Sequence, residues 1–288
     1  MKRKIGKRYL TLVLFIAIAI LTVTFAFLIA NNKAKLTQTN DVSIPTFYLH
    51  GFVGTENSMK SMVESALDTK SADQVVKAKV DKNGMVTLDG QLDTHSKHPV
   101  VDIILEDNSN KDLEKNGQWI RNVIVATMAE YHFDKFNIVA HSMGNQSFSY
   151  YMLKYGLDSH LPLLNKQVSL AGNFNGEVSI NGLDLDIALD NEGKPSEMLS
   201  DYRGLLDMKS HYPNTAQVLN IYGDLKDGTY SDGRVTNVSS RSLEYLLGDN
   251  IASYETYKVT GPKAEHSELH DNPVVINKIN SFLWGTEK

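Results

Sequence analysis

The distribution of hydrophobic residues divides the chain into one long apolar run and a body of shorter runs. Residues 9–30 form a stretch of 22 positions without a charge, which spans roughly 33 Å as a helix and matches a bilayer core. Five basic residues precede it, and basic residues stay on the cytoplasmic side. We therefore expect residues 1–30 to be a cytoplasmic basic stub and transmembrane anchor, 31–44 a tether, and 45–288 a folded domain outside the membrane.

The alternative to an anchor is a signal peptide that is cleaved before secretion. Signal peptides have a shorter apolar region, about 7 to 15 residues, and end in a small-x-small pattern before the cleavage site. Here the apolar run is longer, and its end, Leu28-Ile29-Ala30-Asn31, does not have the small-x-small pattern. This comparison favours a single-pass membrane protein of the cell surface, and secretion after cleavage stays as the alternative.

The body alternates strand-like and helical patterns. Short buried or alternating runs predict strands at 46–49, 75–80, 85–88, 100–105, 136–140, 168–170, 218–222 and 254–259. Helical spacing of apolar residues predicts helices at 57–67, 119–131, 144–155 and 273–284. This alternation is typical of an α/β domain, with a mainly parallel sheet and helices on both faces.

Two segments depart from the alternation. Asn83-Gly84 lies between two strand-like runs and predicts a β-hairpin. Residues 172–212 are polar and weakly periodic, so we expect them to form a small cap-like insertion above the sheet.

Composition excludes several classes of function. The chain has no cysteine, which excludes disulfides, thiolate catalysis and cysteine-based metal sites. Outside the basic stub there are 24 basic residues against 34 acidic ones, a net charge of -10. Such an acidic body is a poor partner for nucleic acid phosphates.

The strongest chemical signal is Ala140-His141-Ser142-Met143-Gly144, where a predicted strand passes directly into a predicted helix. A serine at such a sharp turn presents its hydroxyl above the sheet, and the small residues on either side allow strand and helix to approach. The backbone N–H of Met143 at the helix start is then a candidate oxyanion donor. The alternative is that Ser142 is only a helix N-cap.

Residues that could complete such a site occur in the appropriate order. The His50-Gly51-Phe52 loop follows the first strand, and the N–H of Phe52 is the candidate second oxyanion donor. Downstream come three acids after one strand and two histidines after the next: Asp224, Asp227 and Asp232, then His266 and His270. Serine, acid and histidine follow one another in this order in hydrolases built on such a sheet.

At these residues the chain resembles the α/β-hydrolase superfamily, and its elbow resembles that of small bacterial lipases whose motif also begins with alanine. The loop 50–52 is similar to their oxyanion strand. Residues 45–284, with the hairpin and the ending His266-Ser267-x-Leu269-His270, resemble exported, membrane-anchored α/β-hydrolases of unknown function from Gram-positive bacteria. The resemblance implies the α/β-hydrolase fold with an inserted β-hairpin and a small cap-like insertion.

The resemblance also favours particular members of each set. Asp232-Gly233-Arg234-Val235 resembles the family's Asp-x-x-Val pattern, which favours Asp232 as the acid, with Asp224 as its competitor. His266 has the position of the lipase base, so His270 is expected to be a cap or a supporting group. The aspartates outside the triad are expected to form turns, with a calcium loop as a weaker alternative.

We therefore expect an extracytoplasmic serine hydrolase that acts on a carboxylic ester, esterase-like or lipase-like, with the triad Ser142, Asp232 and His266 and the oxyanion donors Phe52 and Met143. This chemistry needs no metal or organic cofactor. The alternatives are an acyltransferase that acts on a cell-envelope molecule and a catalytically silent surface-binding module. His50 and His141 are expected to order their loops or to pack, because each adjoins a candidate oxyanion donor.

Overall fold

The computed structural model describes residues 43–93, 95–178 and 187–285. The predicted anchor, residues 9–30, lies outside these ranges, as does most of the predicted tether. Within the described ranges, no helix combines the length and apolar character that crossing a membrane requires.

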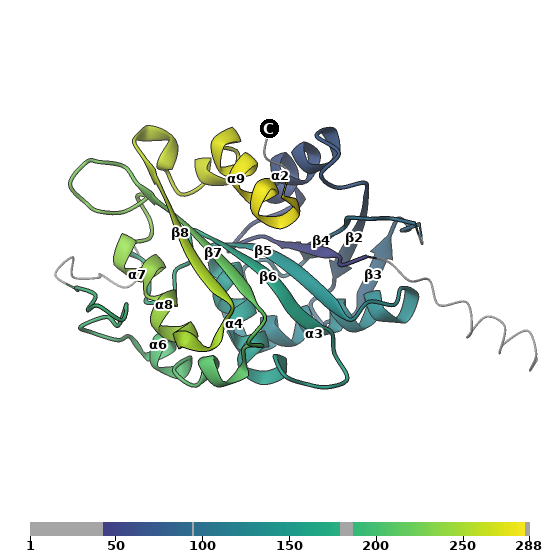
Figure 1. Cartoon of the computed structure of the whole chain (residues 1–288), viewed down its shortest axis with the longest axis horizontal. Helices are drawn as coiled ribbons and strands as arrows, with labels where there is room; N and C mark the ends of the chain where they lie inside the picture. The colour runs from purple at the N-terminus through teal and green to yellow at the C-terminus, as the bar shows by residue number, and fades with distance from the viewer. Residues whose placement is uncertain (1–42, 94, 179–186, 286–288) are drawn as a thin grey trace, which may run out of the picture. The chain divides into compact units, whose positions relative to one another are not determined.

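An eight-stranded sheet runs through the domain in the order β3-β2-β4-β1-β5-β6-β7-β8 (Figure 1). Its strands are β1 (Thr46–Leu49), β2 (Gln74–Val80), β3 (Val86–Asp89), β4 (Pro99–Leu105), β5 (Lys135–His141), β6 (Leu163–Leu170), β7 (Gln217–Asp224) and β8 (Ser253–Thr260). Only the edge pair β2 and β3 is antiparallel. This arrangement confirms the expected α/β fold with a mainly parallel sheet and an inserted hairpin.

Helices cover both faces of the sheet (Figure 1). Helices α2 (Glu56–Asp68) and α9 (Pro273–Trp284) lie on one face, and α3 (Leu113–Glu130) and α4 (Met143–Tyr155) lie on the other. Short helices complete the second side: α6 (Ser200–Gly204), α7 (Asn237–Arg241) and α8 (Leu243–Leu247), with the 3-10 turns η1 (Met208–His211) and η2 (Gly248–Asn250). The 3-10 turns η3 (Pro262–Ala264) and η4 (Glu268–His270) follow β8, and Leu269 of η4 packs in the cluster of α2 and α9. Each face therefore has its own buried hydrophobic cluster.

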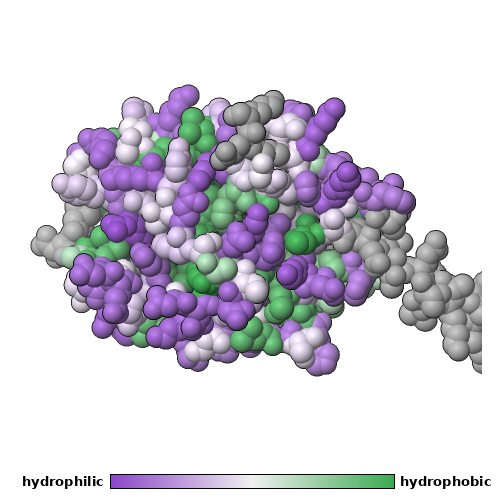
Figure 2. Space-filling model, viewed as in Figure 1, coloured by the Kyte–Doolittle hydropathy of each residue, from purple (hydrophilic) through white to green (hydrophobic). Residues whose placement is uncertain are grey.

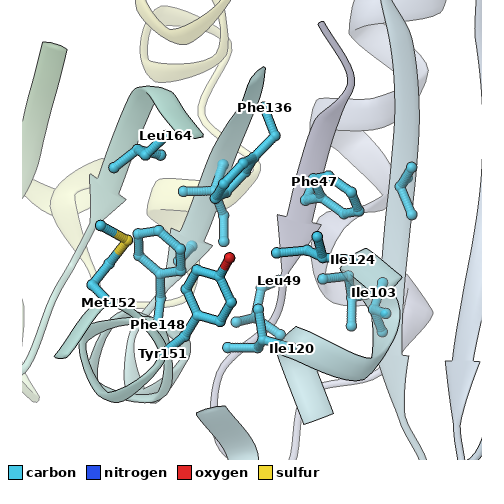
Figure 3. Packing of buried hydrophobic residues seen from close by; sticks show 14 of the residues in the cluster. Phe47, Leu49, Ile103, Ile120, Ile124, Phe136, Phe148, Tyr151, Met152 and Leu164 are labelled. Atoms are coloured by element: carbon cyan, nitrogen blue, oxygen red, sulfur yellow. The ribbon is translucent and has the colours of Figure 1, made fainter. Parts of the chain in front are cut away.

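The larger cluster fills the space between the sheet and helices α3 and α4 (Figure 3). Several aromatic rings meet within it: Phe136 of β5 packs edge-on against Phe148 and Tyr151 of α4. Phe47 of β1 contacts Phe136 in the same edge-on manner. Burying rings of this size contributes a large share of core stability, and it fixes β1, β5 and α4, the elements that carry the candidate site.

The boundaries of several helices have local causes. Asp112 accepts a hydrogen bond from the backbone N–H of Lys115, so α3 begins before the apolar stripe that predicted a helix only from residue 119. Helix α9 has Asn272 as N-cap, Pro273 in its first turn and Gly285 with φ 70° at its end, and it has the predicted bounds.

The hairpin turn also forms as predicted. The Asp81 carboxylate accepts the backbone N–H groups of Asn83 and Met85, and Gly84 adopts φ 85°. A Cβ on Gly84 would lie 2.7 Å from the Trp119 ring, so the close contact of the hairpin with α3 requires glycine here.

The predicted insertion differs from expectation in its second half. Tyr202, Leu205, Met208 and Tyr212 are buried in the larger core cluster, and the Tyr202 hydroxyl donates to the Ser242 carbonyl. This part therefore belongs to the main domain rather than lying above it. Helices α6, α7 and α8 were not predicted, because five residues are too few to show a helical period.

The face of the domain drawn in Figure 2 carries hydrophilic residues over most of its area, with hydrophobic residues in small groups between them. Such a mosaic is the ordinary surface of a water-facing domain.

Candidate active site

Ser142 stands at the turn between β5 and α4, with φ 53° and ψ -129°. A positive φ at a residue other than glycine is strained and is common at functional turns. Ser142 occupies the N-cap position of α4, but its side chain makes no capping hydrogen bond with the helix, so capping does not account for a serine here. Its backbone N–H donates to the Leu170 carbonyl of the neighbouring strand, which holds the turn in place.

Close packing explains the small residues around Ser142. A Cβ on Gly144 would lie 2.7 Å from the His50 carbonyl oxygen, and one on Gly51 would lie 2.8 Å from the Ser142 Cβ. Ala140 is fully buried two positions before the serine. The loop after β1 therefore passes directly beside the Ser142 side chain, which larger residues at these positions would prevent.

The structure joins Ser142, His266 and Asp232 in a continuous hydrogen-bonded row. His266 Nε2 lies 2.9 Å from Ser142 Oγ, and His266 Nδ1 lies 2.8 Å from Asp232 Oδ2. All three residues are at most 5% exposed. Because a carboxylate oxygen only accepts, Nδ1 carries the proton and Nε2 is free to accept the serine proton. A base placed in this way can activate the hydroxyl as a nucleophile.

The backbone of its own loop orients the Asp232 carboxylate. Oδ1 accepts hydrogen bonds from the N–H groups of Arg234 at 2.9 Å and Val235 at 2.7 Å, which leaves Oδ2 directed at the imidazole. The backbone N–H of His266 in turn donates to the Asp232 carbonyl at 2.9 Å. The loops that carry Asp232 and His266 are therefore held to each other by main-chain as well as side-chain hydrogen bonds.

The competing acid Asp224 has other partners. Its carboxylate lies 2.5 Å from the Lys258 ammonium and also bonds the backbone N–H of Lys226 and the Asn237 amide. Burial would raise the pKa of this carboxyl, but the Lys258 and Lys226 hydrogen bonds outweigh burial and lower the pKa to about 2. Asp224 thus ties the end of β7 to β8. Asp227 accepts the N–H and hydroxyl of Thr229 in an exposed turn.

The remaining histidines support the loops of the site. His50 Nε2 accepts the N–H of Leu105, so Nδ1 carries the proton and donates to the Gly51 carbonyl. Burial lowers the pKa of His50. His141 Nε2 donates to the His266 carbonyl at 3.1 Å, and the His141 ring contacts the rings of both His266 and His270. This geometry agrees with the loop-ordering role expected for His50 and His141.

The two candidate oxyanion donors lie beside one pocket, which both Phe52 and Met143 line. Met143 is the first residue of α4, where backbone N–H groups have no partner within the helix. Beyond Phe52, Val53 adopts φ 51°, its N–H donates to the Asn108 carbonyl, and the Asn108 amide donates to the Gly54 carbonyl. Asn108 therefore fixes the loop that carries Phe52.

Sequence reasoning missed several residues of this site. Asn145 donates to the carbonyls of Ala140, Ser142 and Leu170 and so braces the serine turn from below. Gln146 lines the pocket, and its spacing of four from Ser142 on a predicted helix was a usable signal. The ion pair between Glu177 and Arg234 had no sequence signal, because it joins segments 57 residues apart.

The described ranges contain no group of three or more His, Asp or Glu side chains arranged to hold a metal ion.

Comparison with known proteins places this geometry in context. A family model described as "Alpha/beta hydrolase of unknown function (DUF915)" matches residues 33–286. A search of curated proteins finds no match.

Two solved structures share the whole fold. The product of the lin2722 gene of Listeria innocua superposes with a TM-score of 0.77 at 24% identity, over 85% of this chain and 96% of that one. A proposed cell surface hydrolase of Lactobacillus plantarum WCFS1 gives a TM-score of 0.71 at 19% identity, over 85% and 93% of the two chains. At these identities the likeness shows the fold alone.

The burial of His141 predicts a measurable dependence of stability on pH. Burial first, and then the neighbouring His266 and His270, lowers the pKa of His141 well below its ordinary value of 6.5. Below pH 6.5 the unfolded chain therefore binds a proton at His141, whereas the folded chain does not. The contribution of neutral His141 to the free energy of unfolding is complete above pH 6.5 and is lost as the pH decreases.

We expect His141→Asn to remove this decrease in the free energy of unfolding, which is at most about 1.4 kcal/mol per pH unit. Urea unfolding between pH 5 and 7.5 measures it, with His160→Asn as control, since the His160 side chain is 91% exposed. An unchanged slope in His141→Asn would show that His141 is not the group responsible.

Proposed function

Because the chain belongs to the DUF915 family of α/β-hydrolases of unknown function, we propose that it is a serine hydrolase that cleaves a carboxylic ester through an acyl-enzyme on Ser142. The observation that carries this proposal is the buried row of hydrogen bonds from Ser142 through His266 to Asp232. Family membership alone leaves the chemistry open, because one fold serves many reactions. These hydrogen bonds connect a candidate nucleophile to a base, and the base to an acid. This arrangement also argues against a catalytically silent binding module.

In the acylation step, His266 Nε2 takes the Ser142 proton while Ser142 Oγ forms a bond to the ester carbonyl carbon. Asp232 stabilises the resulting imidazolium and keeps its orientation. The N–H groups of Phe52 and Met143 stabilise the negative oxygen of the tetrahedral intermediate. The carbon–alkoxide bond then breaks, and His266 returns the proton to the departing alcohol.

Deacylation repeats these steps with water as the nucleophile. His266 takes a proton from water, the new carbon–oxygen bond forms, and Ser142 leaves with that proton. The products are one carboxylic acid and one alcohol, and the side chains return to their starting states. Every proton is carried by His266, so these residues complete the cycle without a cofactor.

We further propose that residues 1–30 hold the enzyme in the cell membrane with its catalytic domain outside. The charge-free run 9–30 behind five basic residues supports this location.

Covalent labelling tests the nucleophile. A fluorophosphonate should label the purified protein, and Ser142→Ala should abolish labelling, because the reagent reacts only with an activated hydroxyl. The melting temperature should fall by only a few degrees, since Ser142 makes no cap bond and loss of its hydrogen bond to His266 costs about 1 kcal/mol. Ser149→Ala, a buried serine of the same helix, is the matched control and should label normally. Labelling that persists in Ser142→Ala would contradict the proposal.

Paired substitutions test the acid. Asp232→Asn should lower the acylation rate by about 10⁴-fold, because an amide neither stabilises the imidazolium nor fixes its tautomer. Asp224→Asn is the matched control and should retain most of the rate, because its carboxylate bonds lysines instead. Circular dichroism should confirm that both variants fold. The reverse pattern, with Asp224→Asn inactive, would refute Asp232 as the acid while leaving the hydrolase intact.

Cell fractionation tests the location. The protein should pellet with membranes, and protease added to intact cells should remove the catalytic domain, because the basic stub stays inside. Recovery of a chain beginning near Asn31 from the medium would show that the segment is a cleaved signal peptide.

A further inference from the structure

A pocket of about 170 Å³ opens beside the two candidate oxyanion donors. Phe52, Leu113, Met143 and Leu199 give it apolar walls, while Gln146, Asn173 and Glu177 bring polar groups into it. Pockets that enclose drug-sized ligands are roughly 300–1,000 Å³, so this one suits a short group. A pocket for a plain alkyl chain would need no buried amides or carboxylate, because burying them without partners costs free energy.

Gln146 is the decisive residue of this pocket. It is only 7% exposed, yet its amide makes no hydrogen bond with any residue in the described part of the chain. It lies one helical turn after Ser142 on α4, so it belongs to the face of the helix that adjoins the nucleophile. Buried polar groups are normally hydrogen-bonded, so a free amide in a pocket indicates a polar ligand.

Asn173 adds a second unused group. Its Nδ2 donates to Glu177 Oε1 at 2.7 Å, which fixes the orientation of the amide. Asn173 Oδ1 has no hydrogen-bond partner within the described ranges. This oxygen lies below the accessible surface, so it contributes to the polar character of the pocket wall rather than to a direct ligand contact.

The charges around the pocket indicate a neutral ligand. The buried Glu177 carboxylate pairs with Arg234 Nε at 3.2 Å. The remaining charged residues of the lining are Lys111 and Asp201, which are exposed and of opposite sign. The positive and negative charges around the pocket therefore cancel. A neutral hydroxyl, which both donates and accepts hydrogen bonds, matches the Gln146 amide better than an ion does.

The position of the pocket identifies the part of the ester that it receives. His266 must protonate the departing alcohol, so the alcohol leaves on the His266 side of Ser142. The pocket is lined by Phe52 and Met143 and by no residue of the acid or base loops, 224–235 and 262–272. It therefore lies on the oxyanion side, where the acyl group stays attached to the serine.

We propose that this pocket binds a short acyl group that carries a hydroxyl, and that Gln146 is the residue that selects it. The inference rests on the proposed function, since it needs an acyl-enzyme at Ser142. Sites built to bond a substrate hydroxyl reject the analogue that lacks it, because their buried groups are then left unpaired.

Matched esters test the proposal in the full chain. Methyl lactate is compared with methyl propionate, and methyl 3-hydroxybutyrate with methyl butyrate, so each pair differs by one hydroxyl. In at least one pair the hydroxyl should raise kcat/KM by about tenfold or more. Gln146→Leu should lower that ratio by at least about fivefold, because leucine offers no hydrogen bond. Leucine favours a helix, so α4 should persist.

Gln118→Leu is the matched control, because it makes the same change on α3 outside the pocket lining, and it should keep the wild-type ratio. A wild-type ratio near one in both pairs overturns the inference, as does an equal ratio in Gln146→Leu and wild type. Fluorophosphonate labelling is run in parallel. Labelling of Ser142 without hydrolysis of any of the four esters also overturns the inference alone, whereas absence of labelling overturns the proposed function itself.

Discussion

The close approach of three backbone segments at Ser142 is the constraint on which the site depends. The end of β5, the start of α4 and the loop after β1 meet so tightly that Gly51 and Gly144 have no room for a Cβ. Ser142 is held there at a positive φ that a serine adopts only under external restraint. The restraint comes from Asn145, whose amide bonds three carbonyls below the turn, and from the strands buried on both sides. Local strain is thus maintained by the packing of the whole sheet.

Backbone hydrogen bonds also position Asp232 and His266. Two main-chain N–H groups fix one oxygen of Asp232, and the His266 N–H bonds the Asp232 carbonyl. Arg234 links this loop to the pocket wall, because its carbonyl accepts the N–H of Val178 and its side chain pairs with Glu177. The pocket wall at Glu177 and the loop that carries Asp232 are therefore parts of one connected structure.

Local patterns in the sequence predicted the features that depend on short-range physics. The apolar strands, the Asn-Gly hairpin and the strand–serine–helix turn each depend on residues close in the chain, and the structure forms all of them. The choice between Asp224 and Asp232 depends on contacts with Lys258 and His266, which are more than 30 residues away, and only a resemblance favoured one of them. Helices α6 to α8 and the pocket lining were beyond prediction for related reasons. The former are too short to show a period, and the latter combines residues from at least four separate segments.

If Ser142 is the nucleophile, it carries the acyl group during turnover, and trapping that acyl-enzyme is the decisive experiment. The protein is mixed with a p-nitrophenyl ester, quenched in acid within the first turnover, digested and analysed by mass spectrometry. We expect the acyl group to appear on the peptide that contains Ser142, together with a burst of p-nitrophenol, and then to disappear as the substrate is exhausted. Steady release of p-nitrophenol with no acyl group on Ser142, or with the group on another residue, would contradict it.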